Sequence, residues 1–122
     1  MPHRVLVVDD AMFMRAMIRD ILVNSGAYEV VGEAANGEEA VAQYKALKPD
    51  LVTMDIVMPQ MDGIEATREI VKFNSKARVV MCSALGQEAL VIESIAAGAK
   101  DFIVKPFSAE KVLKVLDSAV TG

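Results

Sequence analysis

The sequence predicts an α/β fold, a doubly wound parallel sheet of five strands with five helices on its two faces. Short apolar runs alternate with amphipathic stretches along the chain, an order typical of successive βα units. The runs are almost uniformly apolar, as expected of strands that are covered on both faces. Because neighbouring parallel strands need a crossover connection, each intervening stretch is expected to be a helix.

The predicted strands are short apolar runs that end at polar or turn-forming residues. They are residues 4–8 (RVLVV), 29–34 (EVVGEA), 51–54 (LVTM), 78–83 (RVVMCS) and 101–104 (DFIV). Runs of this length are typical of buried strands and too short for most helices.

Between the strands, apolar residues recur at helical spacing. Two such faces are formed by Ala40, Val41, Tyr44 and Leu47, and by Val112, Leu113, Leu116, Ala119 and Val120. In the stretch 87–97, the same spacing predicts that Val91, Ile92 and Ile95 face the sheet and that Leu90 faces solvent. Gly26 and Gly98 follow two of these helices, where a left-handed residue commonly ends a helix.

Composition indicates one cytoplasmic domain over residues 1–122, expected to be a monomer. The net charge is -4 and the 13 Lys and Arg residues are scattered, which argues against nucleic-acid binding. No apolar run reaches the length of a membrane span, and the N-terminus shows no signal-peptide pattern, so membrane insertion is not expected. The single cysteine, Cys82, excludes an internal disulfide and is expected to be buried and inert.

Polar side chains follow four of the five predicted strands. Asp9 and Asp10 follow the first strand, Asp55 the third, Ser83 ends the fourth, and Lys105 follows the fifth. The carboxyl ends of parallel strands meet at one edge, where open α/β sheets bind their ligands. Taken singly, Asp9 or Asp10 could instead cap the helix that begins near residue 12. Taken together, the residues predict a site.

The three carboxylates predict a metal ion. Two carboxylates about 4 Å apart repel by roughly 4 kcal/mol at an effective dielectric constant near 20, so a cluster of three needs a cation. Hard oxygen ligands with few protein donors suit Mg²⁺ better than Ca²⁺, which takes more oxygens. Lys105 and Ser83 would add the positive charge and the hydrogen-bond donor that a phosphoryl group needs.

Four motifs, in this order and spacing, resemble the receiver domains of two-component response regulators. They are VLVVDD (5–10), DLVTMDIVMPQMDG (50–63), MCSA (81–84) and GAKDFIVKPF (98–107). The resemblance covers essentially the whole chain, leaves no room for an output domain, and is greatest to the single-domain regulators of chemotaxis. It implies a flavodoxin-like sheet with strand order 2-1-3-4-5.

The resemblance also implies the role of each carboxylate. Asp55 would be the phosphoacceptor, which attacks a phosphohistidine on a sensor histidine kinase. Asp10 and Asp55 would ligate Mg²⁺ together with the backbone carbonyl of Val57, and Asp9 would act through a metal-bound water.

Further residues match the positions that respond to phosphorylation in the family. Lys105 would pair with the phosphoryl group, and the Ser83 hydroxyl and the Ala84 backbone N–H would donate to its oxygens. Ser83 and Phe102 would form the switch, in which the aromatic ring turns inward. The Lys105–Pro106 peptide bond is expected to be cis.

The function implied is a phosphorylation-activated switch in chemotaxis, with only weak self-phosphorylation and self-dephosphorylation and no true enzymatic turnover. Its output partner would be a flagellar motor switch protein, bound at a surface comprising Leu90, Phe102, Lys111 and Lys114. Val57 and Leu85 would flank the phosphoryl group with apolar side chains that cannot orient water, so a separate phosphatase is also expected.

Other functions fit the sequence less well or stay open. An aspartate-nucleophile phosphatase of the haloacid dehalogenase type would need Asp where Val57 stands. A flavin-binding domain would need a Ser/Thr-rich loop where residues 9–14 read DDAMFM. A phosphorelay intermediate, which passes the phosphoryl group to a histidine phosphotransfer protein, stays open as an alternative. A receiver domain cut from a transcription factor is disfavoured, because residues 116–122 (LDSAVTG) are expected to close the last helix without a linker.

Overall fold

The structure is a computed structural model that describes residues 2–84 and 86–121. Strands and helices alternate along these residues in the predicted order. They are β1 (His3–Val8), α1 (Met12–Ser25), β2 (Tyr28–Ala34), α2 (Gly37–Leu47), β3 (Leu51–Asp55), α3 (Gly63–Phe73), β4 (Val79–Ser83), α4 (Glu88–Ala96), β5 (Asp101–Val104) and α5 (Ala109–Thr121). None of these helices combines the length and the apolar character that crossing a lipid bilayer requires.

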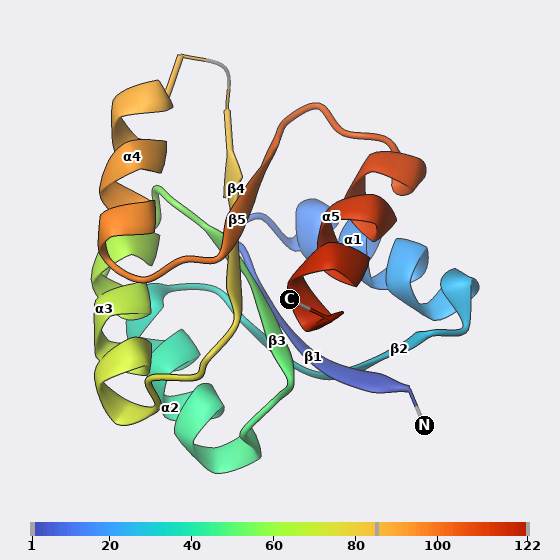
Figure 1. The fold of residues 1–122 in the computed structure, drawn as a ribbon, viewed down its shortest axis with the longest axis horizontal. Helices are drawn as coiled ribbons and strands as arrows, with labels where there is room; N and C mark the ends of the chain where they lie inside the picture. The colour runs from blue at the N-terminus through green and yellow to red at the C-terminus, as the bar shows by residue number, and fades with distance from the viewer. Residues whose placement is uncertain (1, 85, 122) are drawn as a thin grey trace.

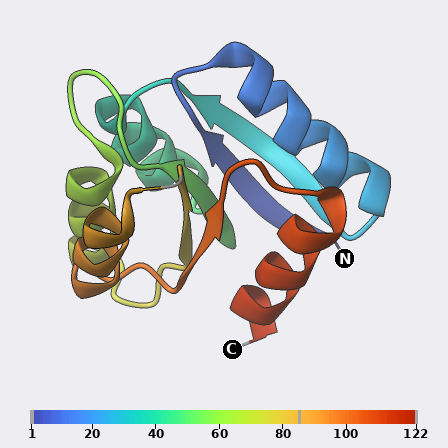
Figure 2. The same ribbon diagram turned by 90° about the horizontal axis from the view of Figure 1, so that it is seen from above.

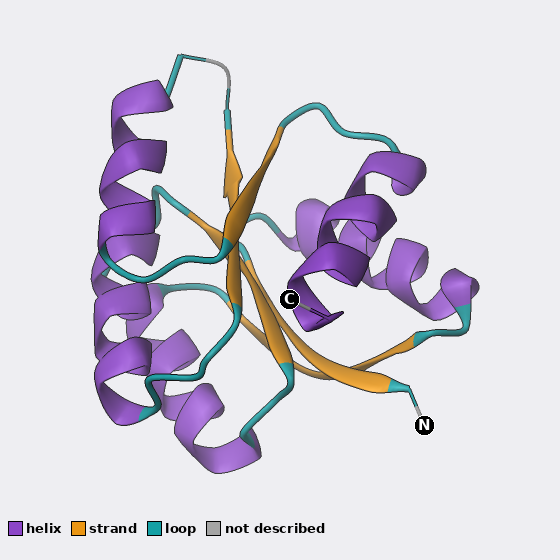
Figure 3. Ribbon diagram, viewed as in Figure 1, coloured by secondary structure: helices purple, strands orange, loops and turns teal. Residues whose placement is uncertain are grey.

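The strands form one parallel sheet in the order β2-β1-β3-β4-β5. Helices α1 and α5 cover one face, and α2, α3 and α4 cover the other (Figure 1). Figure 2, seen from above, shows the sheet between the two groups of helices, and Figure 3 shows the strands as the central layer. The predicted fold class and strand order are therefore confirmed.

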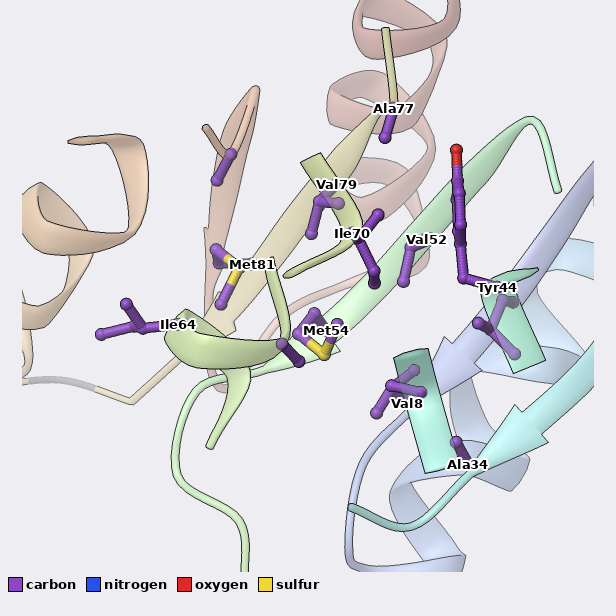
Figure 4. Close-up of a cluster of buried hydrophobic side chains, with 14 of the residues drawn as sticks. Val8, Ala34, Tyr44, Val52, Met54, Ile64, Ile70, Ala77, Val79 and Met81 are labelled. Carbon is purple, nitrogen blue, oxygen red and sulfur yellow. The ribbon is translucent and has the colours of Figure 1, made fainter. Parts of the chain in front are cut away.

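Each face of the sheet carries its own apolar core. Val5 and Val7 of β1 pack toward α1 and α5, whereas Leu6 and Val8 pack toward α2 and α3, and all four are buried. Figure 4 shows part of the second core, where Met54 lies among the labelled side chains. This burial on both faces is why the strands read as continuous apolar runs.

The predicted buried cysteine belongs to the core beneath α1 and α5. Cys82 is 2% exposed and is a free thiol. Burial, aided by the nearby carboxylates and opposed by Lys105, raises the pKa of the Cys82 thiol to about 12. The thiol is therefore un-ionised at neutral pH, as expected of an inert cysteine.

The predicted glycines stand at the helix ends, whereas the alternative role of Asp9 or Asp10 as a helix cap is not observed. Gly26 and Gly98 have φ angles of 74° and 117°, in the left-handed region that glycine adopts readily. The N-cap of α1 is Ala11, and no side chain caps this helix. Asp9 and Asp10 therefore do not cap the helix, although Asp9 Oδ1 accepts from the N–H of the N-cap residue Ala11 at 2.9 Å.

The predicted orientation of α4 is right for Val91, which packs against the core, but wrong for Leu90, Ile92 and Ile95. Ile92 and Ile95 are 71% and 44% exposed, whereas Leu90 and Val91 are partly buried against the core. Ser94 is fully buried, because its hydroxyl donates to the carbonyl of Leu90 at 2.8 Å and needs no water. A pattern based on hydrophobicity counts Ser94 as outward-facing and therefore turns the helix the wrong way.

Candidate metal and phosphoacceptor site

The carboxyl ends of four strands bring the predicted polar residues to one edge of the sheet. Asp9 and Asp10 follow β1, Asp55 ends β3, Ser83 ends β4, and Lys105 follows β5. Strand pairing places Asp55 opposite Cys82 and Ser83 opposite Val104, so these ends lie side by side. The predicted convergence is confirmed.

Three carboxylates form a compact cluster within the described residues. Asp9, Asp10 and Asp55 each offer an oxygen, and these oxygens all lie within 4.8 Å of one another. The side chains of Asp9 and Asp55 are 1% and 13% exposed, whereas Asp10 is exposed and leaves the cluster open to solvent. Such a set of oxygen donors, with one side accessible to water, fits Mg²⁺.

Lys105 supplies the positive charge in this site. Its Nζ lies 3.2 Å from Asp9 Oδ2 and 3.3 Å from Asp55 Oδ1, and its side chain is 24% exposed. Burial lowers the pKa of Lys105, but the two carboxylates outweigh it, and the pKa is raised. The ammonium is therefore charged at neutral pH. The Lys105–Pro106 bond is cis, as predicted.

The two oxygens of Asp55 have different surroundings. Oδ1 accepts from Lys105 and from the backbone N–H of Ile56 at 3.0 Å. Oδ2 forms no hydrogen bond with the described residues, so one oxygen is held and the other is available to react. Burial and the charge of Asp9 raise the pKa of Asp55 to about 6 against the effect of Lys105, so the carboxylate is mostly ionised at neutral pH.

This raised pKa predicts how the stability of the metal-free protein depends on pH. Between 3.8 and about 6, an unfolded chain releases the Asp55 proton while the folded protein retains it. The free energy of unfolding therefore falls as pH rises through this range, and the loss is complete above it. Asp55→Asn removes the loss, so we expect the variant to be about 1 to 3 kcal/mol more stable than the wild type near pH 8.

Urea unfolding in a chelating buffer measures this difference. Near pH 4 the two proteins should differ much less, because most of the loss has not yet occurred at that pH. A variant that is equally stable or less stable near pH 8 would show that the ionised Asp55 carboxylate does not destabilise the folded protein.

Ser83 is buried beside this cluster with an unpaired hydroxyl. It is 1% exposed, and its Oγ has no hydrogen-bond partner among the described residues. The neighbouring Ala84 N–H, predicted to bind a phosphoryl oxygen, instead donates to Gln87 Oε1 at 2.7 Å. Gln87 would have to release this N–H before a phosphoryl group could take it.

Of the two residues predicted to flank the phosphoryl group, Val57 lies within the described part of the chain. Val57 lies two residues after Asp55, and its side chain is 59% exposed. Leu85 lies outside the described residues. Val57 is thus an exposed apolar side chain close to Asp55 in sequence, and its position beside a bound phosphoryl group stays a prediction.

The predicted output residues do not all share one surface. Phe102 is 39% exposed and, with Ile92 and Ile95, lines a groove of about 470 Å³ between α4 and β5. Lys111 borders a second hollow beside Phe102, and Lys114 is exposed on the same helix. Leu90 packs inward instead, because α4 is rotated relative to the prediction, so Ile92 and Ile95 take its place at this surface.

Arg15 is a residue that the sequence did not single out. Its Nη1 donates to the backbone carbonyl of Asp9 at 2.6 Å, and its Nε pairs with Glu33 at 3.1 Å. Glu33 also pairs with Arg19 at 2.6 Å, so α1 is tied to β2 beside the cluster. Nothing in the local sequence distinguishes Arg15 from an ordinary surface arginine, because its charged partner, Glu33, lies on a different element, β2.

Comparison with known proteins identifies the family. The model of the response regulator receiver domain matches residues 5–117. The chain belongs to the response regulator receiver family. Among its relatives, the chemotaxis protein CheY of Bacillus subtilis is 59% identical over 120 residues, which cover 98% of this chain and 99% of that protein. CheY of Thermotoga maritima is 60% identical over 117 residues, which cover 96% of this chain and 97% of that protein.

Solved structures of receiver domains agree with the fold. The response regulator domain of Thermotoga maritima CheB has a TM-score of 0.93 at 42% identity, covering 100% of this chain and 98% of that one. A CheX–CheY–BeF3–Mg²⁺ complex from Borrelia burgdorferi contains a chain with a TM-score of 0.91 at 45% identity, covering 97% and 89%. The resemblance to single-domain chemotaxis receivers is therefore confirmed.

Proposed function

We propose that this chain is a phosphorylation-activated switch in chemotaxis signalling, in which Asp55 accepts a phosphoryl group from a sensor histidine kinase. The main support is the arrangement of Asp55 itself. One carboxylate oxygen is held by Lys105, the other is available, and two more carboxylates stand within 4.8 Å. The near full-length chemotaxis relatives support the same function.

In the proposed transfer, Asp55 Oδ2 attacks the phosphorus of a phosphohistidine. The new O–P bond forms as the N–P bond breaks, and the electron pair of that bond returns to the imidazole nitrogen. Asp10, Asp55 and the Val57 carbonyl would hold Mg²⁺ directly, with Asp9 acting through water. The bound ion would offset the negative charge of the transferring phosphoryl oxygens.

Lys105 and Ser83 would then bind the transferred group. The ammonium of Lys105 would move from the carboxylates to a phosphoryl oxygen, where a charge-assisted hydrogen bond is strong. The Ser83 hydroxyl would donate to another oxygen and so gain the partner that it lacks in this structure. Because the chain supplies charge and donors but no strong general base, we expect slow chemistry rather than enzymatic turnover.

The signal would leave through the groove between α4 and β5. Ser83 lines this groove together with Phe102, so movement of Ser83 toward a phosphoryl group would change the position of the aromatic ring. The walls are apolar, and Lys111 and Lys114 lie on the neighbouring helix. We propose that the ligand is a short, acidic, amphipathic segment of a flagellar motor switch protein.

A separate phosphatase would end the signal. Val57 is an exposed apolar side chain two residues after Asp55, and an apolar side chain cannot orient an attacking water molecule. Self-hydrolysis of the Asp55 phosphate would therefore be slow.

Removal of the metal tests the proposed function. We expect phosphorylation by acetyl phosphate to fall about 100-fold in EDTA and to recover when Mg²⁺ is restored, because uncompensated carboxylates repel the phosphodonor. The measurement is the acid-labile radioactive label on the protein after a fixed time. Phosphorylation at the full rate in EDTA would refute the metal requirement.

The docking surface gives a second test. We expect Ile95→Ser and Lys114→Glu each to weaken binding of the phosphorylated protein to the motor segment about fivefold to tenfold, or roughly 1 to 1.4 kcal/mol. In the wild type, phosphorylation should raise affinity about tenfold, because it only shifts a conformational equilibrium. Fluorescence anisotropy of a labelled segment gives the dissociation constants.

Val23→Ser is a matched control for the loss of an exposed apolar side chain. Val23 is 56% exposed on α1, away from α4 and β5, and its substitution should leave binding unchanged. If both groove variants bind like the wild type, the output surface lies elsewhere. Capture of a histidine phosphotransfer protein in place of the motor protein would favour the phosphorelay role.

A further inference from the structure

The loop between β3 and α3, residues 56–62, is attached to the N-terminus of α2. The backbone N–H of Gly37 donates to the Met61 carbonyl at 2.8 Å. The side-chain amide of Asn36 donates from Nδ2 to Gln60 Oε1 at 2.9 Å, across 24 residues of sequence. We call these four residues the loop latch. In Figure 2 the loop rises beside the start of α2.

The backbone contact in the loop latch requires glycine. A Cβ atom built at Gly37 would lie 2.2 Å from the Met61 carbonyl oxygen, which is backbone and cannot move aside as a side chain can. The loop therefore approaches α2 more closely than any other residue at this position would allow.

Asn36 is held in the orientation that this contact needs. Its Oδ1 caps α2 by accepting from the Glu39 N–H at 2.9 Å, and its Nδ2, besides the bond to Gln60, donates to Glu39 Oε2 at 3.2 Å, so Glu39 fixes both ends of the amide. The partner, Gln60, has a φ angle of 69°, which costs a residue other than glycine about 1 kcal/mol or more. A strained conformation of this kind persists only where its surroundings fix it.

The same loop carries one of the proposed metal ligands. Its first residue, Ile56, follows Asp55 directly, and the Ile56 carbonyl accepts from the Gly63 N–H at 2.7 Å. This bond closes the base of the loop, so the loop latch is a separate attachment of its outer part. Val57 lies between these two attachments.

We propose that Asn36 is a positioning residue of the metal site. It acts through Gln60 and Met61 to fix the β3–α3 loop, and so fixes the backbone carbonyl of Val57 for Mg²⁺. This inference rests on the proposed function, because that function supplies the metal. The side chain of Asn36 hydrogen-bonds to Glu39 and Gln60 and, among the described residues, to neither the three carboxylates nor Lys105.

Mn²⁺ binding to the variants Asn36→Ser, Gln60→Ala and the double variant tests the inference without any phosphodonor. Serine keeps a side-chain oxygen that can cap α2, but it has no amide to reach Gln60. We expect each single substitution to raise the Mn²⁺ dissociation constant about threefold to tenfold, and the double variant to match the single ones, because all three lose the same contact. Amide exchange in residues 57–61 should accelerate in parallel.

Asn74→Ser is the matched control. Asn74 ends α3 at the opposite edge of the sheet, where its amide donates to the Tyr44 hydroxyl at 3.1 Å. This control should lose stability toward urea but keep its Mn²⁺ affinity.

The outcomes separate the inference from the proposed function. A wild-type protein that binds no Mn²⁺ would overturn both. Normal binding by the wild type and by Asn36→Ser would overturn the inference alone, even if Asn36→Ser unfolds at lower urea. Effects of the two single substitutions that multiply in the double variant would also overturn it.

Discussion

We expect the Asp55→Asn variant to accept no phosphoryl group, with a rate at least about 1000-fold below that of the wild type. The carboxamide has nearly the same shape as the carboxylate but lacks the negatively charged oxygen that attacks phosphorus. Lys105 keeps its contact with Asp9, 3.2 Å away, so the site should not collapse. The measurement is the acid-labile label acquired from acetyl phosphate or from a phosphorylated kinase.

Asp62→Asn is the matched control for this substitution. Asp62 is an exposed residue of the same loop, and it caps α3 by accepting from the Glu65 N–H at 2.9 Å. Asparagine caps helices as well as aspartate does, so phosphorylation should proceed normally. A label that forms on Asp55→Asn at the wild-type rate would place the phosphoacceptor on another side chain.

Replacing Gly63 by alanine should destabilise the protein by about 3 to 5 kcal/mol. A Cβ atom at Gly63 would lie 2.0 Å from the backbone carbonyl oxygen of Asp55, a contact that only a shift of β3 or α3 could relieve. The intrinsic helix propensity of alanine returns only about 1 kcal/mol. Urea unfolding measures the loss, and the remaining folded protein should phosphorylate slowly because Asp55 is displaced.

Gly26→Ala provides the contrast. Gly26 has no atom within 4 Å of an added Cβ atom, and its φ angle of 74° is the source of the penalty. That penalty should be about 1 to 2 kcal/mol. Equal losses in the two variants would show that the close approach of Gly63 to Asp55 does not limit stability.

The fold could be predicted because the three central strands, β1, β3 and β4, are buried almost throughout on both faces. Such strands appear as apolar runs, and the observed strands differ from the predicted ones only at their ends. β1 begins at His3, one residue earlier than predicted, where its N–H donates to the Ala27 carbonyl at 3.0 Å. β3 extends to Asp55 because this residue pairs with Cys82 of β4. Pairing with a neighbouring strand decides where a strand begins and ends, and this pairing cannot be predicted from the sequence of one strand alone.

The site could be predicted as a set of residues but not as a set of contacts. Asp55 and Lys105 stand at strand ends, where the topology brings them together. The roles of individual residues came from the family resemblance. The amino-acid pattern does not encode the contacts of two further residues. Gln87 accepts the hydrogen bond of the Ala84 N–H, and the buried Ser94 sets which side of α4 faces the core.

The unpaired hydroxyl of Ser83 bears on the energy balance of the resting state. A buried polar group without a partner costs about 1 to 3 kcal/mol, and the resting protein carries this cost at Ser83. Any conformation that gives the hydroxyl an acceptor recovers it, which corresponds to roughly a 5-fold to 150-fold change in relative population. In the proposed switch a phosphoryl oxygen would be this acceptor, so relief of the unpaired Ser83 hydroxyl would supply part of the free energy of the conformational change.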